Sequence, residues 1–198
     1  MQTEIEAKFL DIDPEKIHTV LAGIGAKLVH PERPMKRKVF DYADRRLEKT
    51  GGWVRVRDEG DGKITLSFKR VVDWESVHGT KEISTEVQDF TAACDILTAI
   101  GLDTKAYQET KREKWILNNV EITIDTWPWI PPFIEIEGPT EDSVKLIARK
   151  LGFPWENAVF GSVETEYKKH YAVTDEEIDG WETITFVPVP DWLEIKRK

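Results

Sequence analysis

The chain has 198 residues, the size of one domain or of one domain with a tail. Its 28 Lys and Arg residues against 37 Asp and Glu residues give a formal net charge of −9, which disfavours a protein that coats DNA or RNA. The single cysteine, Cys94, excludes a disulfide framework and a cysteine-rich zinc site. No apolar run approaches the ~20 residues of a membrane span, and the first residues lack the pattern of a signal peptide. We therefore expect a soluble cytoplasmic protein without nucleic-acid or membrane partners.

The first half of the chain predicts one helix among several strands. A short acidic strand at Glu4–Glu6 precedes a helix that begins after Asp13 and ends at Gly25, because an Asp-Pro pair caps an apolar stripe of helical spacing. A polar loop covers residues 71–80. The other strands expected in this half cover residues 36–42, 52–58 and 63–70, with a turn at Asp58–Gly62 between the last two.

Two further helices and four strands are predicted in the second half. The helices begin after Asp89 and Thr140 and end at Gly101 and Gly152, and an acidic strand lies ahead of each, as it does ahead of the first helix. The strands cover residues 81–88, 112–118, 120–127 and 132–138, and Asn118-Asn119 forms a tight hairpin turn between two of them.

A change in composition marks the C-terminal segment. From Asp175 onwards the chain carries seven acids, three bases and two tryptophans. Two prolines, Pro188 and Pro190, adjoin a short strand candidate at Thr183–Val187, so we expect an appendage of irregular path whose aromatic side chains pack on the domain.

Alternation along the predicted strands separates charged from apolar residues. Glu4, Glu6 and Lys8 share one strand face, and Arg55 shares a face with Arg57. A sheet with one solvated face is the ordinary interpretation. Solvated faces, however, usually carry scattered polar residues, whereas paired acids and paired bases dominate one strand after another here. We infer a closed or nearly closed antiparallel barrel with its charged faces inside and its apolar outer face covered by the three helices.

A charged lumen is a functional hypothesis, because charges leave water only when they are paired or bound to a metal or a ligand. Arginines and lysines at several heights along a tunnel match the phosphoryl oxygens of a linear polyphosphate. Carboxylates in the same lumen would repel that ligand unless Mg²⁺ or Mn²⁺ intervened. This combination of groups predicts phosphoryl or nucleotidyl transfer.

A set of short motifs occurs in a specific order over about residues 2–171. The first is Glu4-Ile-Glu6-Ala-Lys8, and the later ones are Trp53–Arg57, Thr65–Lys69, Lys111–Glu113, Ile122–Asp125 and Phe133–Glu137. The set resembles the CYTH, or triphosphate tunnel metalloenzyme, family, whose members include class IV adenylyl cyclases and thiamine triphosphatase. The resemblance implies an α+β fold with an eight-stranded antiparallel β-barrel and outer helices. It implies a tunnel domain at residues 1–174, followed by an acidic, tryptophan-containing extension at residues 175–198.

The resemblance also assigns roles to individual residues. Those expected to bind the triphosphate substrate are Lys8, Lys38, Arg55, Arg57, Lys69, Lys81, Arg112 and Lys168. Lys8, Arg57 and Lys69 among them are expected to act in catalysis. The residues expected to bind Mg²⁺ or Mn²⁺ are Glu4, Glu6, Asp125, Glu135 and Glu137.

The chain departs from the family pattern in the second strand and near the C-terminus. The family's D-T-Y-x-D reads Arg37–Asp41, which leaves open whether Lys36, Arg37 or Lys38 faces the tunnel. Glu166 stands where the cyclase-like branch has Ser. The charges around Glu166 also fit a solvated helix face, so a phosphate-binding role for Lys168 is one of two interpretations.

Three functions follow from the resemblance. We favour hydrolysis of inorganic triphosphate, thiamine triphosphate or a nucleoside triphosphate. A class IV adenylyl cyclase ranks second, because Glu166 replaces the family's Ser. A polyphosphate or nucleotide sensor that binds without turnover is the third, because the second strand is altered and the Lys expected before the hairpin is displaced to Lys111. The sequence leaves the oligomeric state open, although members of the family often form homodimers.

Overall fold

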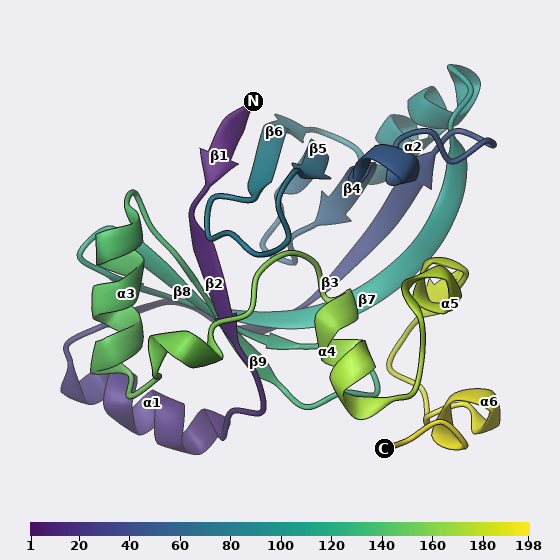
Figure 1. Ribbon diagram of the computed structural model, residues 1–198. Coiled ribbons are helices and arrows are strands. Elements are labelled where there is room, and N and C mark those ends of the chain that lie inside the picture. Colours follow the sequence, from purple (N-terminus) through teal and green to yellow (C-terminus); the bar gives the residue numbers. More distant parts are fainter.

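The N-terminal segment closes the sheet of the computed structural model, which describes residues 1–198 (Figure 1). β1 (Gln2–Glu4) pairs antiparallel with β6 (Thr80–Val87), and β2 (Glu6–Phe9) pairs antiparallel with β9 (Phe133–Glu137). Between them the chain crosses from one edge of the sheet to the other at Ile5, whose carbonyl oxygen accepts a 3.0 Å hydrogen bond from the Gly138 amide. The two ends of the strand order are thereby joined through the N-terminal segment, which makes a nearly closed barrel.

The strand order is β1-β6-β5-β4-β3-β7-β8-β9-β2. The strands not yet introduced are β3 (Lys27–Asp41), β4 (Gly52–Asp58), β5 (Ile64–Val71), β7 (Asp103–Leu117) and β8 (Val120–Thr126). All neighbours along this path are antiparallel, which confirms the predicted barrel. The path holds nine strands instead of the expected eight, because the crossing at Ile5 divides the N-terminal strand in two.

Two strands are much longer than predicted. β3 and β7 contain 15 residues each and pair with one another along most of their length, which makes them the longest strands in Figure 1. The predicted strands 36–42 and 112–118 cover only one end of each. Register shifts between Leu28 and Arg33 and the prolines at positions 31 and 34 interrupt the period of two, so alternation could not reveal the N-terminal part of β3.

The three predicted helices are confirmed as α1 (Pro14–Gly23), α2 (Phe90–Ala99) and α3 (Glu141–Lys150). The side chains of Asp13 and Asp89 accept hydrogen bonds from backbone amides three residues later, and Thr140 does so within a capping box. The predicted hairpin turn is also present, since Asn118 and Asn119 have φ values of 51° and 64°. None of the helices has the length and apolar character needed to cross a bilayer.

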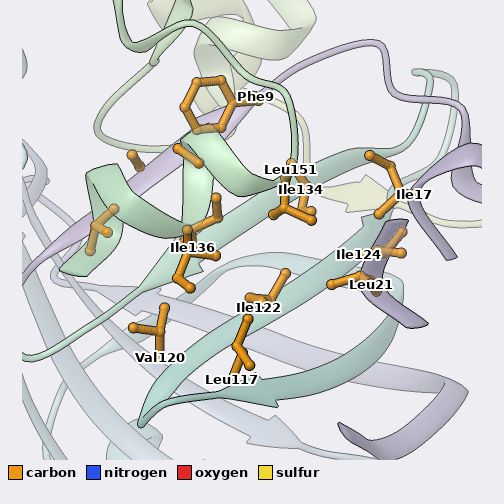
Figure 2. Close-up of a cluster of buried hydrophobic side chains, with 14 residues drawn as sticks. Phe9, Ile17, Leu21, Leu117, Val120, Ile122, Ile124, Ile134, Ile136 and Leu151 are labelled. Atoms are coloured by element: carbon orange, nitrogen blue, oxygen red, sulfur yellow. The ribbon is translucent and has the colours of Figure 1, made fainter. Parts of the chain in front are cut away.

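The outer face of the barrel carries the hydrophobic core. Figure 2 shows the largest cluster, in which Ile122 and Ile136 of the sheet meet Leu21 of α1. α3 contributes Ile147 to the same cluster, while α2 covers Phe40 and Val56 on another part of the barrel in a separate cluster. Because inward and outward residues alternate, burial of these apolar side chains against the helices turns the charged residues of the same strands into the lumen.

The C-terminal segment packs on the barrel through aromatic side chains, as predicted. It contains the short helices α5 (Asp175–Asp179) and α6 (Asp191–Glu194), and the short helix α4 (Glu164–His170) precedes it. The Trp181 ring lies 5.1 Å from Tyr167, 5.4 Å from Trp192 and 6.1 Å from Trp129, measured between ring centroids.

The strand expected at Thr183–Val187 is shorter than predicted. Only β10 (Thr183–Ile184) forms, parallel to Tyr107 and Gln108 of β7. The chain then turns, because the Val187 amide donates a 2.7 Å hydrogen bond to the Thr185 carbonyl oxygen. Two short 3₁₀ turns, η1 (Glu48–Thr50) and η2 (Trp155–Asn157), complete the secondary structure.

We expect Trp181→Ala to lower the free energy of unfolding by about 2–4 kcal/mol, because it removes the ring that joins the tail to the barrel. Ile195→Ala is the matched control in the same tail, since Ile195 is 83% exposed. That variant should change the free energy by less than about 0.5 kcal/mol. Urea unfolding measures both values, and equal losses in the two variants would contradict the aromatic anchor.

Candidate active site

The interior of the barrel is a cavity of about 680 Å³ lined mainly by charged side chains. The strands position these side chains by alternation, and the two segments on either side of Ile5 both direct their acids inward. The charged residues that the strands contribute to the lining are Glu4, Glu6, Lys8, Arg37, Arg55, Arg57, Lys69, Glu82, Lys105, Arg112, Glu121, Glu135 and Glu137. α4 adds Glu164 and Lys168, and the C-terminal segment adds Asp175 and Asp179.

Most of the residues predicted from the sequence meet in this cavity, but three do not line it. The structure brings together Glu4, Glu6, Lys8, Arg55, Arg57, Lys69, Arg112, Glu135, Glu137 and Lys168. Lys38 follows the inward-facing Arg37, and Lys81 precedes the inward-facing Glu82, so both lysines lie on the outward side of their strands. Asp125 stands opposite Arg112 in the β7–β8 register and faces the same side, but it does not line the cavity.

The pair formed by Arg112 and Asp125 explains why this aspartate does not reach the cavity. Arg112 donates to both Asp125 oxygens, from Nε at 2.7 Å and from Nη2 at 2.9 Å. The Thr123 hydroxyl donates a further bond to Asp125 Oδ2 at 2.9 Å. Asp125 therefore fixes the orientation of the Arg112 guanidinium in a bidentate pair, and its oxygens are engaged within the protein.

Lys8 occupies the most enclosed basic position. It is 5% exposed, its Nζ lies 3.8 Å from Glu6 Oε1 and 3.7 Å from Glu135 Oε2, and it donates to the Gly161 carbonyl oxygen. Although burial disfavours the ammonium ion, Glu6 and Glu135 raise the pKa of Lys8 above its ordinary value. Burial likewise disfavours the Glu135 carboxylate, but Lys8 and Arg112 lower its pKa to about 2. Both groups are therefore charged at neutral pH.

A row of glutamates crosses three strands beside Lys8. Glu6 of β2 stands directly opposite Glu137 of β9, which stands opposite Glu121 of β8. Like charges in this arrangement are destabilising. Burial and the neighbouring Glu135 and Glu6 raise the pKa of Glu137 to about 7. Sequence reasoning missed Glu121, although it shares the parity of Thr123 and Asp125 on the same strand.

The glutamate row has the donor chemistry of a hard-cation site. Its oxygens are of the kind that Mg²⁺ and Mn²⁺ take, and Mg²⁺ is commonly held by one or two carboxylates together with substrate phosphates. No three His, Cys, Asp or Glu side chains converge here into a complete metal cage. The residues that fit a cation shared with a phosphate are thus Glu6 and Glu137, with Glu121 beside them.

The other part of the wall carries a cluster of guanidinium groups. The Arg57 Nη2 atom lies 2.7 Å from Glu59 Oε1, and the Arg55 Nη2 atom lies 3.5 Å from Glu82 Oε1. Arg37 stands directly opposite Arg57 in the β3–β4 register, which answers the question that the sequence left open among positions 36–38. Burial and the neighbouring Arg57 lower the pKa of Arg55 to about 10. Sequence reasoning missed Glu59, because it lies in a predicted turn and folds back beside Arg57.

Between the two regions, Lys69 links the N-terminal strand to β6. Its Nζ lies 2.8 Å from Glu4 Oε2 and 3.2 Å from Glu82 Oε2. Burial and the neighbouring Glu82 raise the pKa of Glu4. The two acids therefore share one ammonium group, and this arrangement would gain from a further cation.

Glu166 on α4 is a buried carboxyl group without a partner. Its side chain is 2% exposed, and neither oxygen has a hydrogen-bond donor. Burial raises the pKa of Glu166 to about 7, although Lys8 lowers it. The unfolded chain would hold this proton only below about pH 4.5. The folded protein thus binds the proton more tightly, and stability is lost as the pH rises from about 4.5 to about 7.

We expect Glu166→Gln to remove this loss of stability. Relative to the wild type, the variant should gain about 3 kcal/mol in free energy of unfolding between pH 4.5 and pH 8, because burial raises the pKa of the Glu166 carboxyl group to about 7. Urea unfolding at the two pH values measures the gain. Glu176→Gln, at an exposed position of α5, is the control without a pH-dependent gain. A gain of equal size in both variants would contradict the role of burial.

Comparisons with known proteins agree with this arrangement. The CYTH domain family model matches residues 2–153. A structure of a candidate adenylate cyclase from Vibrio parahaemolyticus has a TM-score of 0.73 at 14% identity, covering 84% of this chain and 98% of that chain. The PH1012 protein of Pyrococcus horikoshii has a TM-score of 0.66 at 24% identity, covering 78% and 93% of the two chains.

A third structure, a candidate adenylyl cyclase from Hippeastrum described as having a dominant triphosphatase activity, has a TM-score of 0.58 at 14% identity. It covers 89% of this chain and 94% of its own length. No curated protein gives a significant match. These structural likenesses show a shared fold, and the family model spans most of the barrel and its helices. The chain therefore belongs to the CYTH family.

Proposed function

We propose that this protein hydrolyses a triphosphate in its charged cavity with the help of Mg²⁺ or Mn²⁺. The observation that carries the proposal is the separation of charge inside one lumen. Guanidinium groups gather on β3, β4 and β7, while the glutamate row lies on β2, β8 and β9. A linear polyanion with a divalent cation matches both parts, because the guanidinium groups can donate to its phosphoryl oxygens and the glutamates can bind the cation.

The basic side chains would bind and orient the substrate. Arg55, Arg57 and Arg112 present forked donors to phosphoryl oxygens, each backed by a carboxylate that fixes its direction. Lys8 and Lys69 add point charges nearer to the glutamates. Such preorganised cations stabilise the charge that develops on the transferring phosphoryl group, which is the main task of a protein in this chemistry.

The reaction is the displacement of a phosphoric anhydride by water. The water oxygen forms a bond to the terminal phosphorus as the bridging P–O bond breaks. The electron pair leaves with the bridging oxygen, and the products are orthophosphate and the shortened phosphate chain. A proton from the water passes to solvent or to a product. Glu6 and Glu137 are the residues proposed to hold the cation, which when bound neutralises phosphate charge.

Product analysis tests the proposal directly. The protein is incubated with inorganic triphosphate, thiamine triphosphate or ATP in the presence of Mg²⁺ or Mn²⁺, and the products are identified by chromatography. Release of orthophosphate is the expected result. Cyclic AMP with pyrophosphate would instead assign a cyclase, and tight binding without turnover would assign a sensor.

We expect Arg57→Ala to lower kcat/KM for the best triphosphate by about 10²- to 10³-fold, because it removes a charge-stabilising donor from the cavity. Lys36→Gln is the matched control, since Lys36 lies on a neighbouring strand with its side chain 49% exposed. Steady-state phosphate release measures both. Retention of full activity by Arg57→Ala would remove the arginine cluster from the proposed site.

A second variant addresses the cation. Glu137→Gln should raise the Mg²⁺ concentration at half-maximal activity by about tenfold, because it replaces one anionic oxygen donor by an amide. A titration of activity against Mg²⁺ gives this value for variant and wild type. The same midpoint for both proteins would place the cation elsewhere in the cavity.

A further inference from the structure

Arg37 differs from every other basic residue that lines the cavity. Seven of them have a carboxylate oxygen within 4.0 Å, namely Lys8, Arg55, Arg57, Lys69, Lys105, Arg112 and Lys168. Arg37 has none. Its charge is therefore the one lumen cation that the protein does not neutralise by direct pairing.

The Arg37 side chain is nevertheless held in a defined position. Its Nε donates a 2.7 Å hydrogen bond to Gln108 Oε1 across the β3–β7 pair. Its guanidinium carbon lies 4.2 Å from the centroid of the Trp127 ring, which is the geometry of a cation–π contact. The two terminal nitrogens make no hydrogen bond within the protein. Gln108 and Trp127 thus hold the guanidinium group in place, and its two terminal nitrogens are free to donate hydrogen bonds.

The surroundings of Arg37 favour an anion in front of that fork. Arg57 stands directly opposite it in register, and Arg55 and Arg112 add like charges from the same lumen. Burial and these three arginines lower the pKa of Arg37 well below its ordinary value. A half-buried cation repelled by three others is costly unless a ligand supplies negative charge. The free donors of Arg37 and the repulsion from the neighbouring arginines both indicate an anionic ligand at this position.

We propose that Arg37 is a specificity-determining residue that binds the second terminal phosphoryl group of inorganic triphosphate. This inference rests on the proposed triphosphatase function and names its substrate. Inorganic triphosphate ends in a fully ionisable phosphoryl group on both sides. A nucleoside triphosphate has an ester-linked ribose at one end, with one ionisable oxygen fewer for a guanidinium fork to bind.

The C-terminal segment encloses the part of the cavity to which Arg37 belongs. Ile184 of β10 lies beside Gln108, the residue that holds Arg37, and both line the cavity. Trp127 contacts Tyr167, which in turn contacts Trp181 of the same segment. The hydrogen-bond donors beside Arg37 are sufficient to bind a small phosphoryl group. A nucleoside at the same position would clash with the C-terminal segment.

The test compares two substrates in one variant. Arg37→Gln removes the charge and the terminal guanidinium donors and keeps a shorter polar side chain. It should lower kcat/KM for inorganic triphosphate by roughly 10- to 100-fold and for ATP by less than about threefold, as expected for loss of one charged hydrogen-bonding group. Arg37→Lys should recover part of the loss. Lys36→Gln, on the outward side of the same strand, should leave both substrates unchanged.

Binding measurements separate this inference from the proposed function. Calorimetry with inorganic triphosphate and with ATP, both with Mg²⁺, reports affinity whether or not turnover occurs. Selective weakening of inorganic triphosphate binding in Arg37→Gln supports the inference, whether or not the wild type hydrolyses this ligand. Absence of hydrolysis by the wild type would contradict only the proposed function. Equal losses for both ligands, no loss, or a wild type that binds ATP as tightly as inorganic triphosphate would overturn it. Thermal unfolding confirms folding, and removal of this repelled cation should not lower Tm.

Discussion

Charge compensation inside a closed barrel governs the rest of this structure. The lumen holds basic and acidic side chains away from water, and the fold can tolerate them only because they pair across strands. Lys8 lies between Glu6 and Glu135, Lys69 joins Glu4 to Glu82, and Arg112 is held by Asp125. Where pairing is incomplete, at the glutamate row and at Arg37, the protein retains charges of opposite sign at separate places. Those incomplete places are the ones where ligands fit best.

Barrel closure is what brings these charges together. Had the N-terminal segment continued along a single edge, Glu4 and Glu6 would share one face of that strand and both would belong to that edge. The crossing at Ile5 instead lets β1 complete one edge and β2 the other, with both acids inside. The apolar residues between the charged ones meet the helices outside. The same alternation therefore builds the hydrophobic core and the site. The core residues and the site residues lie on opposite faces of the same strands, so one set cannot change face unless the other does.

Two departures from the family pattern gain a physical meaning in the structure. At Arg37 the chain places a cation where the family pattern has an acid, and the cation is stacked on Trp127 without a carboxylate beside it. At Glu166 a carboxyl group replaces a hydroxyl and lies buried with neither oxygen hydrogen-bonded. Both substitutions alter the charge of the enclosed space. These two substitutions, more than the barrel geometry, distinguish this chain from other proteins that share its fold.

Short-range patterns in the sequence determined much of this protein. Alternation indicated the inward charged faces, Asp13, Asp89 and Thr140 marked the helix starts, and the paired asparagines marked a hairpin, because each signal depends only on residues close in the chain. Only the tertiary structure decided which partner each charge has. The parity of Lys36, Arg37 and Lys38 stayed open because the adjacent Val39 and Phe40 are both apolar, and only the fold places Phe40 in the core and Val39 in the cavity lining. Asp125 and Glu59 became partners of arginines, and Arg37 was left without a partner, because pairing across strands depends on distance in space and not on spacing in sequence.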